Sequence, residues 1–255
     1  MSALFSPVDL GGMTVSNRIV VSPMCQYVAV NGAATSWHLI HLGGLALSGA
    51  GTLCIEATAV EPEGRITPGC LGLWDEATAA ALEPAIDAVR QYSTARLVIQ
   101  LAHAGRKGSS RVPWEGGQVI PIHAGGWDLE QTVAFARELQ MRGVDWITAS
   151  SGGISPLQKI PVEPGYQLPF AQAVRATGVH TVAVGLITDP AQAEDIIASG
   201  KADSVALARA MLYDPRWGWH AAAALGAIVD APPSYWRALP HGVSGVFRNS
   251  SHGGR

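Results

Sequence analysis

Residues 18–60 contain three segments of different pattern in succession: RIVVSPM (18–24), SWHLIHLGGLALSGA (36–50) and TLCIEATAV (52–60). The first and third are short β-rich runs, whereas the second has the length of a helix and ends in glycine. Two strands joined by a helix pair in parallel, because such a crossover is too long for a hairpin. The beginning of the chain therefore predicts an α/β protein with a parallel sheet.

The same alternation continues toward the C-terminus. A helix at 75–92 and a strand at 96–103 follow first. The pattern then predicts helices at 128–142, 169–176, 190–198 and 216–225, and strands at 145–150, 180–187 and 202–209. A closed (β/α)8 barrel needs eight strands, and this pattern supplies about six. We therefore predict an α/β fold, a TIM (β/α)8-type barrel truncated internally to about six βα units.

Residues 105–126 interrupt the alternation with a stretch rich in Gly, Ser and Pro that has no periodic segment. A structureless loop of this length is uncommon inside a compact domain. We therefore expect a barrel domain over residues 1–240, with a deletion junction near 119–126. The remaining residues, 241–255, are rich in Gly, Ser, His and Arg and are expected to form a flexible tail.

Composition excludes several classes of protein. Charged residues make up 15% of the chain and the formal net charge is −3, so no basic surface for nucleic acid or a membrane is expected. The three cysteines, Cys25, Cys54 and Cys70, form no C-x-x-C pair, which favours a reducing, cytoplasmic location. His38 and His41 are three residues apart on a predicted helix but lack a third ligand, so we expect no metal site.

Six motifs occur at the ends of predicted strands and together span nearly the whole chain. They are NRIVVSPMCQY (17–27), EATAV (56–60) with GRI (64–66), IQLAHAGRK (99–107), SSGG (150–153), GLIT (185–188) and LAR (207–209). Their identity and order resemble the Old Yellow Enzyme family, most closely its bacterial branch of small ene-reductases. The resemblance implies an FMN-binding barrel in which NADPH or NADH supplies hydride for reducing the C=C bond of a small activated alkene. It also implies a homo-oligomer.

The resemblance assigns roles to particular residues. Cys25 would tune the flavin redox potential, Tyr27 would line the substrate site, and Arg237 would reach a neighbouring subunit's site. The implied cofactor contacts are Ser22, Pro23, Met24, Cys25 and Ala57 at the ring, Gln100 at its pyrimidine edge, and Gly185, Ala208 and Arg209 on the phosphate side. Five of these residues also have a simpler interpretation: Cys25 and Tyr27 as packing residues, Gln100 as a buried amide, Arg209 as a surface arginine, and Arg237 as inert.

The chain departs from the family pattern where the alternation breaks. It lacks the family's fourth strand with a His-x-x-His or His-x-x-Asn pair and a nearby tyrosine, its Arg-Thr-Asp-Glu-Tyr-Gly-Gly loop, and the fifth-strand arginine that meets the flavin. By resemblance, the pair would hold the substrate oxygen and the tyrosine would donate the proton. Whether the chain is an enzyme therefore stays open between an ene-reductase with impaired activity and an inactive remnant or flavin-binding or assembly module. An unrelated barrel that binds a phosphorylated metabolite is disfavoured by the strand-end motifs.

Overall fold

The computed structural model describes residues 2–105, 129–152 and 159–250. The expected junction near 119–126 lies outside these residues. The strands are β1 (Val8–Leu10), β2 (Met13–Val15), β3 (Ile19–Val21), β4 (Thr52–Ala59), β5 (Arg96–Ala102), β6 (Trp146–Thr148), β7 (His180–Ala183) and β8 (Ser204–Leu207). The helices are α1 (Ser36–Ala46), η1 (Pro62–Gly64), α2 (Glu76–Tyr92), α3 (Leu129–Met141), α4 (Leu168–Arg175), α5 (Pro190–Ala198), α6 (Arg209–Tyr213), α7 (Trp217–Leu225) and η4 (Pro233–Ala238).

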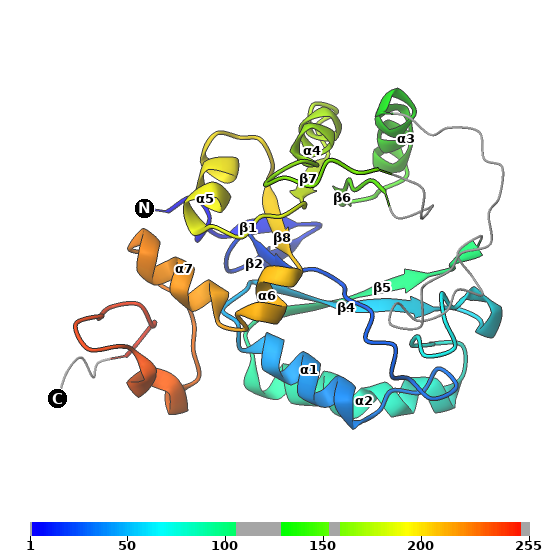
Figure 1. The fold of residues 1–255 in the computed structure, drawn as a ribbon, viewed down its shortest axis with the longest axis horizontal. Helices are drawn as coiled ribbons and strands as arrows, with labels where there is room; N and C mark the ends of the chain where they lie inside the picture. The colour runs from blue at the N-terminus through cyan, green and yellow to red at the C-terminus, as the bar shows by residue number, and fades with distance from the viewer. Residues whose placement is uncertain (1, 106–128, 153–158, 251–255) are drawn as a thin grey trace.

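Six strands form one curled parallel sheet in the order β5-β4-β3-β8-β7-β6. The sheet is a half-barrel whose edge strands are β5 and β6, the two strands that flank the irregular stretch of sequence (Figure 1). A closed barrel would have further strands between these two edges. The prediction of a TIM-type barrel truncated to about six units is therefore confirmed.

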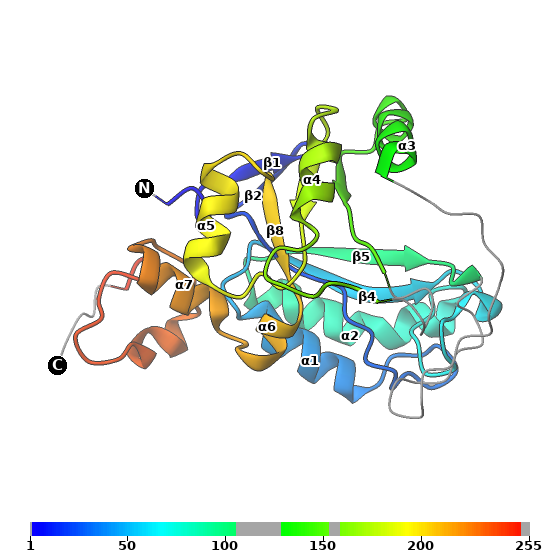
Figure 2. The ribbon, with the colours of Figure 1, turned by 45° about the horizontal axis from the view of Figure 1, so that its top comes forward.

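Helices lie along the outside of the curled sheet. Figures 1 and 2 show α1 and α2 beside β4 and β5, with α3, α4 and α5 on the other arm beside β6, β7 and β8. This arrangement follows from the chain order, because each crossover helix packs against the strands that it joins. Among the described residues, we find no helix with the length and apolar character needed to cross a membrane.

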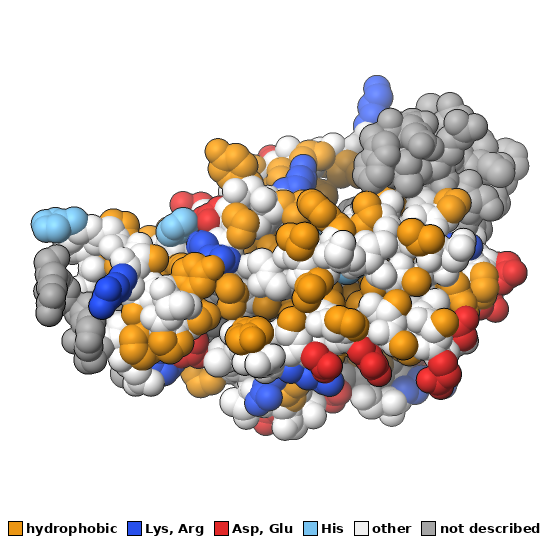
Figure 3. Space-filling view, turned by 90° about the horizontal axis from the view of Figure 1, so that it is seen from below, with side chains coloured by type: hydrophobic (Ala, Val, Ile, Leu, Met, Phe, Trp, Pro, Cys, Tyr) orange, Lys and Arg blue, Asp and Glu red, His pale blue; other side chains and the backbone are white. Residues whose placement is uncertain are grey.

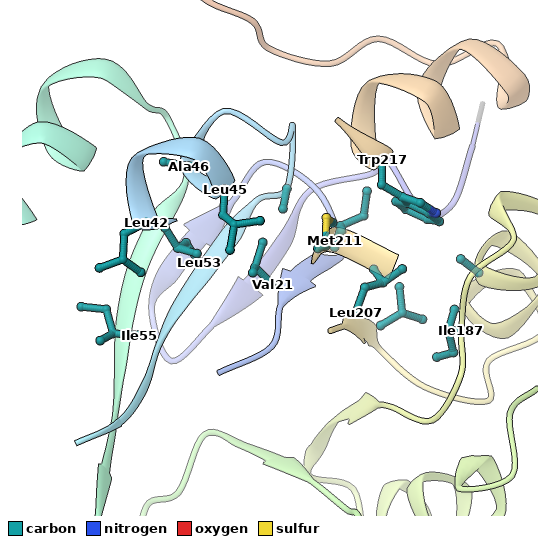
Figure 4. Packing of buried hydrophobic residues seen from close by; sticks show 14 of the residues in the cluster. Val21, Leu42, Leu45, Ala46, Leu53, Ile55, Ile187, Leu207, Met211 and Trp217 are labelled. Carbon is teal, nitrogen blue, oxygen red and sulfur yellow. The ribbon is translucent and has the colours of Figure 1, made fainter. Parts of the chain in front are cut away.

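The main core lies where β3, β4 and β8 meet α1, α6 and α7. Side chains of Val21, Leu53 and Leu207 on the strands point toward those of Leu45 and Met211 on the helices, and all five are buried (Figure 4). Close packing at this point stabilises the junction of β3 and β8, the first and last strands of the six-stranded sheet in chain order. The β3–β8 pairing is the closure that a complete barrel would also have.

Several elements differ from the sequence-based expectations. The strand expected to run to residue 187 ends at Ala183, because Gly185 and Leu186 have positive φ angles of 123° and 49° and turn the chain. The strand expected to run to residue 209 ends at Leu207. The hairpin β1–β2 and the short helices α6 and η4 were not predicted, because each is too short to carry a periodic signal.

Part of the segment expected to be a flexible tail is packed. Val246 and Phe247 are buried, and Phe247 bridges to Val229 in the manner of a short parallel strand. The Phe247 ring also meets the Trp219 ring edge-on, with 5.0 Å between ring centroids. A small second core beside α7 therefore holds the described residues 241–250, which composition alone did not indicate.

Candidate functional site

The expected site residues follow the carboxyl ends of neighbouring parallel strands. Because these strands run in the same direction, their C-terminal ends lie along one edge of the curled sheet, where α/β proteins place their sites. By element, the residues are Ser22, Pro23, Met24 and Cys25 after β3, Ala57 on β4, Gln100 on β5, Gly185 after β7, and Ala208 and Arg209 after β8.

The segment that follows β3 is held by hydrogen bonds to β8 and α1 and by one bond within the segment. The Ser22 backbone N–H donates to the Leu207 carbonyl at 2.9 Å, which ties the segment to β8. The Gln26 amide donates to the Met24 carbonyl at 2.9 Å and accepts the Trp37 indole N–H at 2.9 Å. Cys25 therefore sits in a segment whose backbone position is fixed on both sides.

Tyr27 follows directly, in a left-handed backbone conformation with φ of 58°. This conformation is uncommon for a residue with a Cβ atom and often marks a functional position. The Tyr27 side chain is half-buried, and burial raises its pKa to about 12. The phenol therefore keeps its proton throughout the neutral range.

Glu56 is a buried acid within β4 that the sequence analysis did not select. The β4–β5 register shifts between Ile55 and Thr58, so Glu56 lies in a bulge, a feature that redirects side chains beside functional sites. Burial raises the Glu56 pKa to about 8. Its Oε2 accepts the Gln26 backbone N–H at 3.1 Å. An acid inside an otherwise apolar strand was the signal available in the sequence.

His38 approaches this carboxyl group from α1. Its Nδ1 accepts the Thr35 backbone N–H at 2.9 Å, so the neutral ring carries its proton on Nε2. Nε2 lies 4.0 Å from Glu56 Oε2, and burial lowers the His38 pKa. Among the described residues, neither His38 Nε2 nor Glu56 Oε1 has a hydrogen-bond partner. The pair thus consists of two buried groups that are both largely neutral at pH 7.

Cys25 lies beside Cys70, which the sequence analysis did not connect to the site. Both cysteines are free, and each shifts the pKa of the other, so the two thiols lie close together. The Cys25 thiol and Thr67 lower the Cys70 pKa, whereas Cys70 and burial raise the Cys25 pKa. No sequence spacing could reveal this contact, since the two residues come from different loops.

Gln100 corrects one of the alternatives considered from sequence. In an apolar strand it could have been a buried amide, but its side chain is exposed. The physical reason is the opened sheet: β5 is an edge strand, and the described residues provide no strand to cover its outer side. Gln100 thus presents both an amide donor and an acceptor to solvent.

The phosphate-side residues lie at two turns. Gly185 is buried with φ of 123°, and its carbonyl accepts the Gly165 N–H at 2.8 Å. A Cβ atom there would come within 3.1 Å of the Gln167 side chain, so the close approach favours glycine. Arg209 is the first residue of α6 and is exposed, with the half-buried Ala208 before it. The expectation that Arg209 ends the strand is wrong, because the backbone turns at Ala208.

Arg237 lies apart from the other site residues within one chain. It is an exposed residue of η4, and its neighbour Trp236 lines a groove of about 380 Å³. Asn17, Ala50 and Thr94, which precede β3, β4 and β5, line the same groove. The η4 helix therefore lies at the amino ends of the strands, opposite the edge that carries Cys25 and Gln100.

A flavin oxidoreductase barrel is the class that this fold and these strand-end residues define. Residues 3–144 match the model of the NADH:flavin oxidoreductase / NADH oxidase family. The chain belongs to this family, and the expected class, an FMN-dependent NAD(P)H oxidoreductase, is confirmed.

Relatives agree with this membership. The chain is 31% identical to an NADPH dehydrogenase of Geobacillus thermodenitrificans, over 92% of this chain and 98% of that protein. It is also 31% identical to an NADPH dehydrogenase of Listeria innocua, over 93% of this chain and 99% of that protein. The first alignment spans 336 residues, more than the 255 of this chain, as an internal deletion requires.

Solved structures share the fold. Morphinone reductase superposes with a TM-score of 0.61 at 17% identity, covering 91% of this chain and 92% of that one. A 2-naphthoyl-CoA reductase superposes with a TM-score of 0.65 at 15% identity, covering 88% of this chain and 52% of that one. The half-barrel is therefore recognisably the barrel of these reductases.

Proposed function

We propose that the chain binds FMN along the carboxyl edge of the curled sheet and accepts hydride from NADPH there, with little or no reduction of activated alkenes. The proposal rests on the exposure and lack of polar partners of two side chains, Gln100 and Arg209. Both side chains are exposed, and neither has a hydrogen bond or ion pair among the described residues. Polar groups left unpaired at a strand-end edge suit ligand binding.

The residues present fit the chemistry of FMN. Gln100 offers an amide donor and acceptor to the pyrimidine edge, and Arg209 offers a guanidinium to the phosphate. Ser22 to Cys25 form a fixed segment against which a flat ring could rest. When bound, FMN supplies the ring that carries hydride between the two substrates, while this chain's residues hold and tune it.

Reduction of an alkene also requires groups that hold the substrate oxygen and deliver a proton. The family motifs expected to supply them are missing from the sequence. Among the described residues near Cys25, Tyr27 keeps its proton and Glu56 is buried behind the segment. Neither corresponds to a missing motif, which supports weak alkene reduction. NADPH is the proposed reductant, in line with the relatives' names.

A visible absorption spectrum of the purified chain, recorded after incubation with FMN and removal of free flavin, tests the proposal. Retained flavin absorbance that bleaches on anaerobic addition of NADPH is the expected result. A chain that retains no flavin would instead be an inactive remnant, the alternative that the open sheet between β5 and β6 favours. Retained flavin that NADPH fails to bleach would limit the function to flavin binding.

We further propose a homo-oligomer that uses α1. This helix exposes Trp37, Leu39 and Ile40, which are 48%, 39% and 65% exposed, while its opposite side enters the core. A helix that is apolar on both sides usually has a partner on each. The view from below in Figure 3 shows hydrophobic side chains gathered across the middle of this side of the molecule.

A further inference from the structure

Two loops that are distant in sequence bring Cys25 and Cys70 together. Cys25 follows β3, whereas Cys70 ends the turn that begins at Thr67. The Ala29 backbone N–H donates to the Gly69 carbonyl at 2.9 Å. A Cβ atom on Gly69 would lie only 2.5 Å from the Tyr27 carbonyl oxygen. The loop that carries Cys70 is therefore in direct contact with the chain just after Cys25.

Each thiol is also held individually. The Cys70 backbone N–H donates to the Thr67 carbonyl at 3.1 Å, and the Thr67 hydroxyl lies 3.4 Å from the Cys70 sulfur. The hydrogen bond from Gln26 to Glu56 fixes the residue next to Cys25. Both cysteines therefore lie in segments whose backbones are held in place by hydrogen bonds.

The two sulfurs differ in reactivity. The Cys25 thiol and Thr67 lower the pKa of Cys70 by hydrogen bonding, which favours its thiolate form. Cys25 keeps its proton, and its side chain is partly exposed while that of Cys70 is buried. A thiolate beside a partly exposed thiol is the arrangement in which an oxidised sulfur is trapped as a disulfide.

We propose that Cys25 and Cys70 form a reversible intramolecular disulfide, a redox-modification site in the loop that follows β3. The oxidant is a hydroperoxide. The Cys25 proton first moves to the Cys70 sulfur, so that Cys25 attacks as the thiolate. The peroxide O–O bond breaks, Cys25 becomes a sulfenic acid, and the hydroxide that leaves takes up this proton as the first water. The Cys70 thiolate then attacks the Cys25 sulfur, the S–S bond forms, and hydroxide leaves and takes up the proton that Cys70 had released. The two thiols lose two electrons, and the peroxide is reduced to two waters. No flavin takes part, so the proposal stands independently of the proposed function.

Cys54 provides an internal control. It lies on β4, its S–H is directed at the Ile55 carbonyl at 3.5 Å, and burial raises its pKa to about 11. It lacks both the thiolate character and the thiol neighbour that the proposal requires. Cys54 should therefore stay reduced under conditions that oxidise the pair.

Peptide mapping of the full-length chain tests the proposal. The protein is treated with hydrogen peroxide, free thiols are alkylated, and trypsin is added without reductant. Cleavage after Arg18, Arg65 and Arg90 puts Cys25 and Cys54 on peptide 19–65 and Cys70 on peptide 66–90. The Cys54→Ser variant leaves one thiol on each peptide, so a cross-link between them identifies the pair.

The expected result is a cross-linked 19–65/66–90 species in both the parent and Cys54→Ser, lighter than the two peptides by two hydrogen atoms and lost on reduction. Cys70→Ser should abolish the species and let Cys25 proceed to sulfinic acid. The parent map is decisive even if that variant does not fold. Sulfinic acid on Cys25 in the parent without a cross-link would overturn the proposal. A cross-link that disappears in Cys54→Ser, or that joins two chains, would also overturn it.

Discussion

The backbone N–H of Gln26 donates a 3.1 Å hydrogen bond to Oε2 of Glu56, which places a buried carboxyl group directly behind the loop that follows β3. This bond fixes the position of Cys25 and Tyr27 through the residue between them. The raised Glu56 pKa of about 8 means that the group is largely protonated at neutral pH. The loop is thus supported by a neutral acid, and its support depends on pH.

Glu56 should make the stability of the protein fall as pH rises. An acid whose pKa is near its ordinary value in the unfolded chain and about 8 when folded binds more protons in the folded state between those two values. The free energy of unfolding should therefore decrease with pH across this window, by at most about 1.4 kcal/mol per pH unit. Urea unfolding at a series of pH values measures this slope.

Glu56→Gln is the matched variant, because the amide keeps an acceptor for the Gln26 N–H and cannot ionise. It should remove most of the slope and leave the protein at least as stable as the parent above the folded pKa. Equal slopes in parent and variant would show that Glu56 is already ionised at neutral pH.

FMN affinity should depend on Gln100 and Arg209. Removing either side chain takes away hydrogen bonding to the ligand worth about 1–3 kcal/mol, so the FMN dissociation constant should rise about 5- to 150-fold. Titration of the flavin-free protein with FMN measures this change. Gln91→Ala and Arg90→Ala are the matched controls, because both residues are exposed at the end of α2 and lie away from the carboxyl edge. Affinity unchanged in both test variants would refute the site.

The two halves of the catalytic cycle should differ in rate. Hydride transfer from NADPH requires only a correctly placed flavin ring and room for the nicotinamide beside it. Reduction of an enone such as cyclohexenone also requires the missing oxyanion donors, each worth about 2.7–4 kcal/mol. We expect reduction of bound flavin at a measurable rate and its reoxidation by the enone to be absent or very slow. Anaerobic stopped-flow measures both, with reoxidation by dioxygen as the control for flavin access. Fast reoxidation by the enone would mean that another group replaces the missing histidines.

Substitution by alanine should have opposite effects on the stability of the protein at two glycines. At Gly218 in α7, a Cβ atom would lie 2.5 Å from the Ser48 carbonyl oxygen, so Gly218→Ala should destabilise the protein by about 1–3 kcal/mol through overpacking. At Gly43 in α1, a Cβ atom meets nothing within 4 Å. Gly43→Ala should therefore stabilise the helix by up to about 1 kcal/mol. Denaturant unfolding compares them, and a destabilised Gly43→Ala would indicate a partner on this face of α1.

The α1 surface should control oligomerisation. Ile40→Lys places a charge in the middle of the exposed apolar patch and should shift the protein toward monomer in light scattering. Met141→Lys on α3, also at a highly exposed position, is the control and should keep the parent's mass. A monomeric parent chain would refute the oligomer outright.

The sequence alone determined the order of strands and helices and the family. Alternation of apolar runs is a local property, so the strands at 52–59 and 96–102 and the helix at 76–92 could be predicted closely. The strand-end motifs also marked Gln100 and Arg209, because parallel strands place their ends together. Local patterns failed where no periodicity exists, as in the hairpin β1–β2 and the turn at Ala208.

Only the tertiary structure decided which residues meet. Glu56 and His38, and likewise Cys25 and Cys70, come from segments whose separation in sequence says nothing of their contact. Exposure was also undetermined: Gln100 is exposed because β5 became a sheet edge, and Phe247 is buried because it packs against Trp219. Burial raises the pKa of Glu56 to about 8, and hydrogen bonding to close neighbours lowers that of Cys70. Such shifts arise from desolvation and short-range hydrogen bonds, which exist only once the chain has folded.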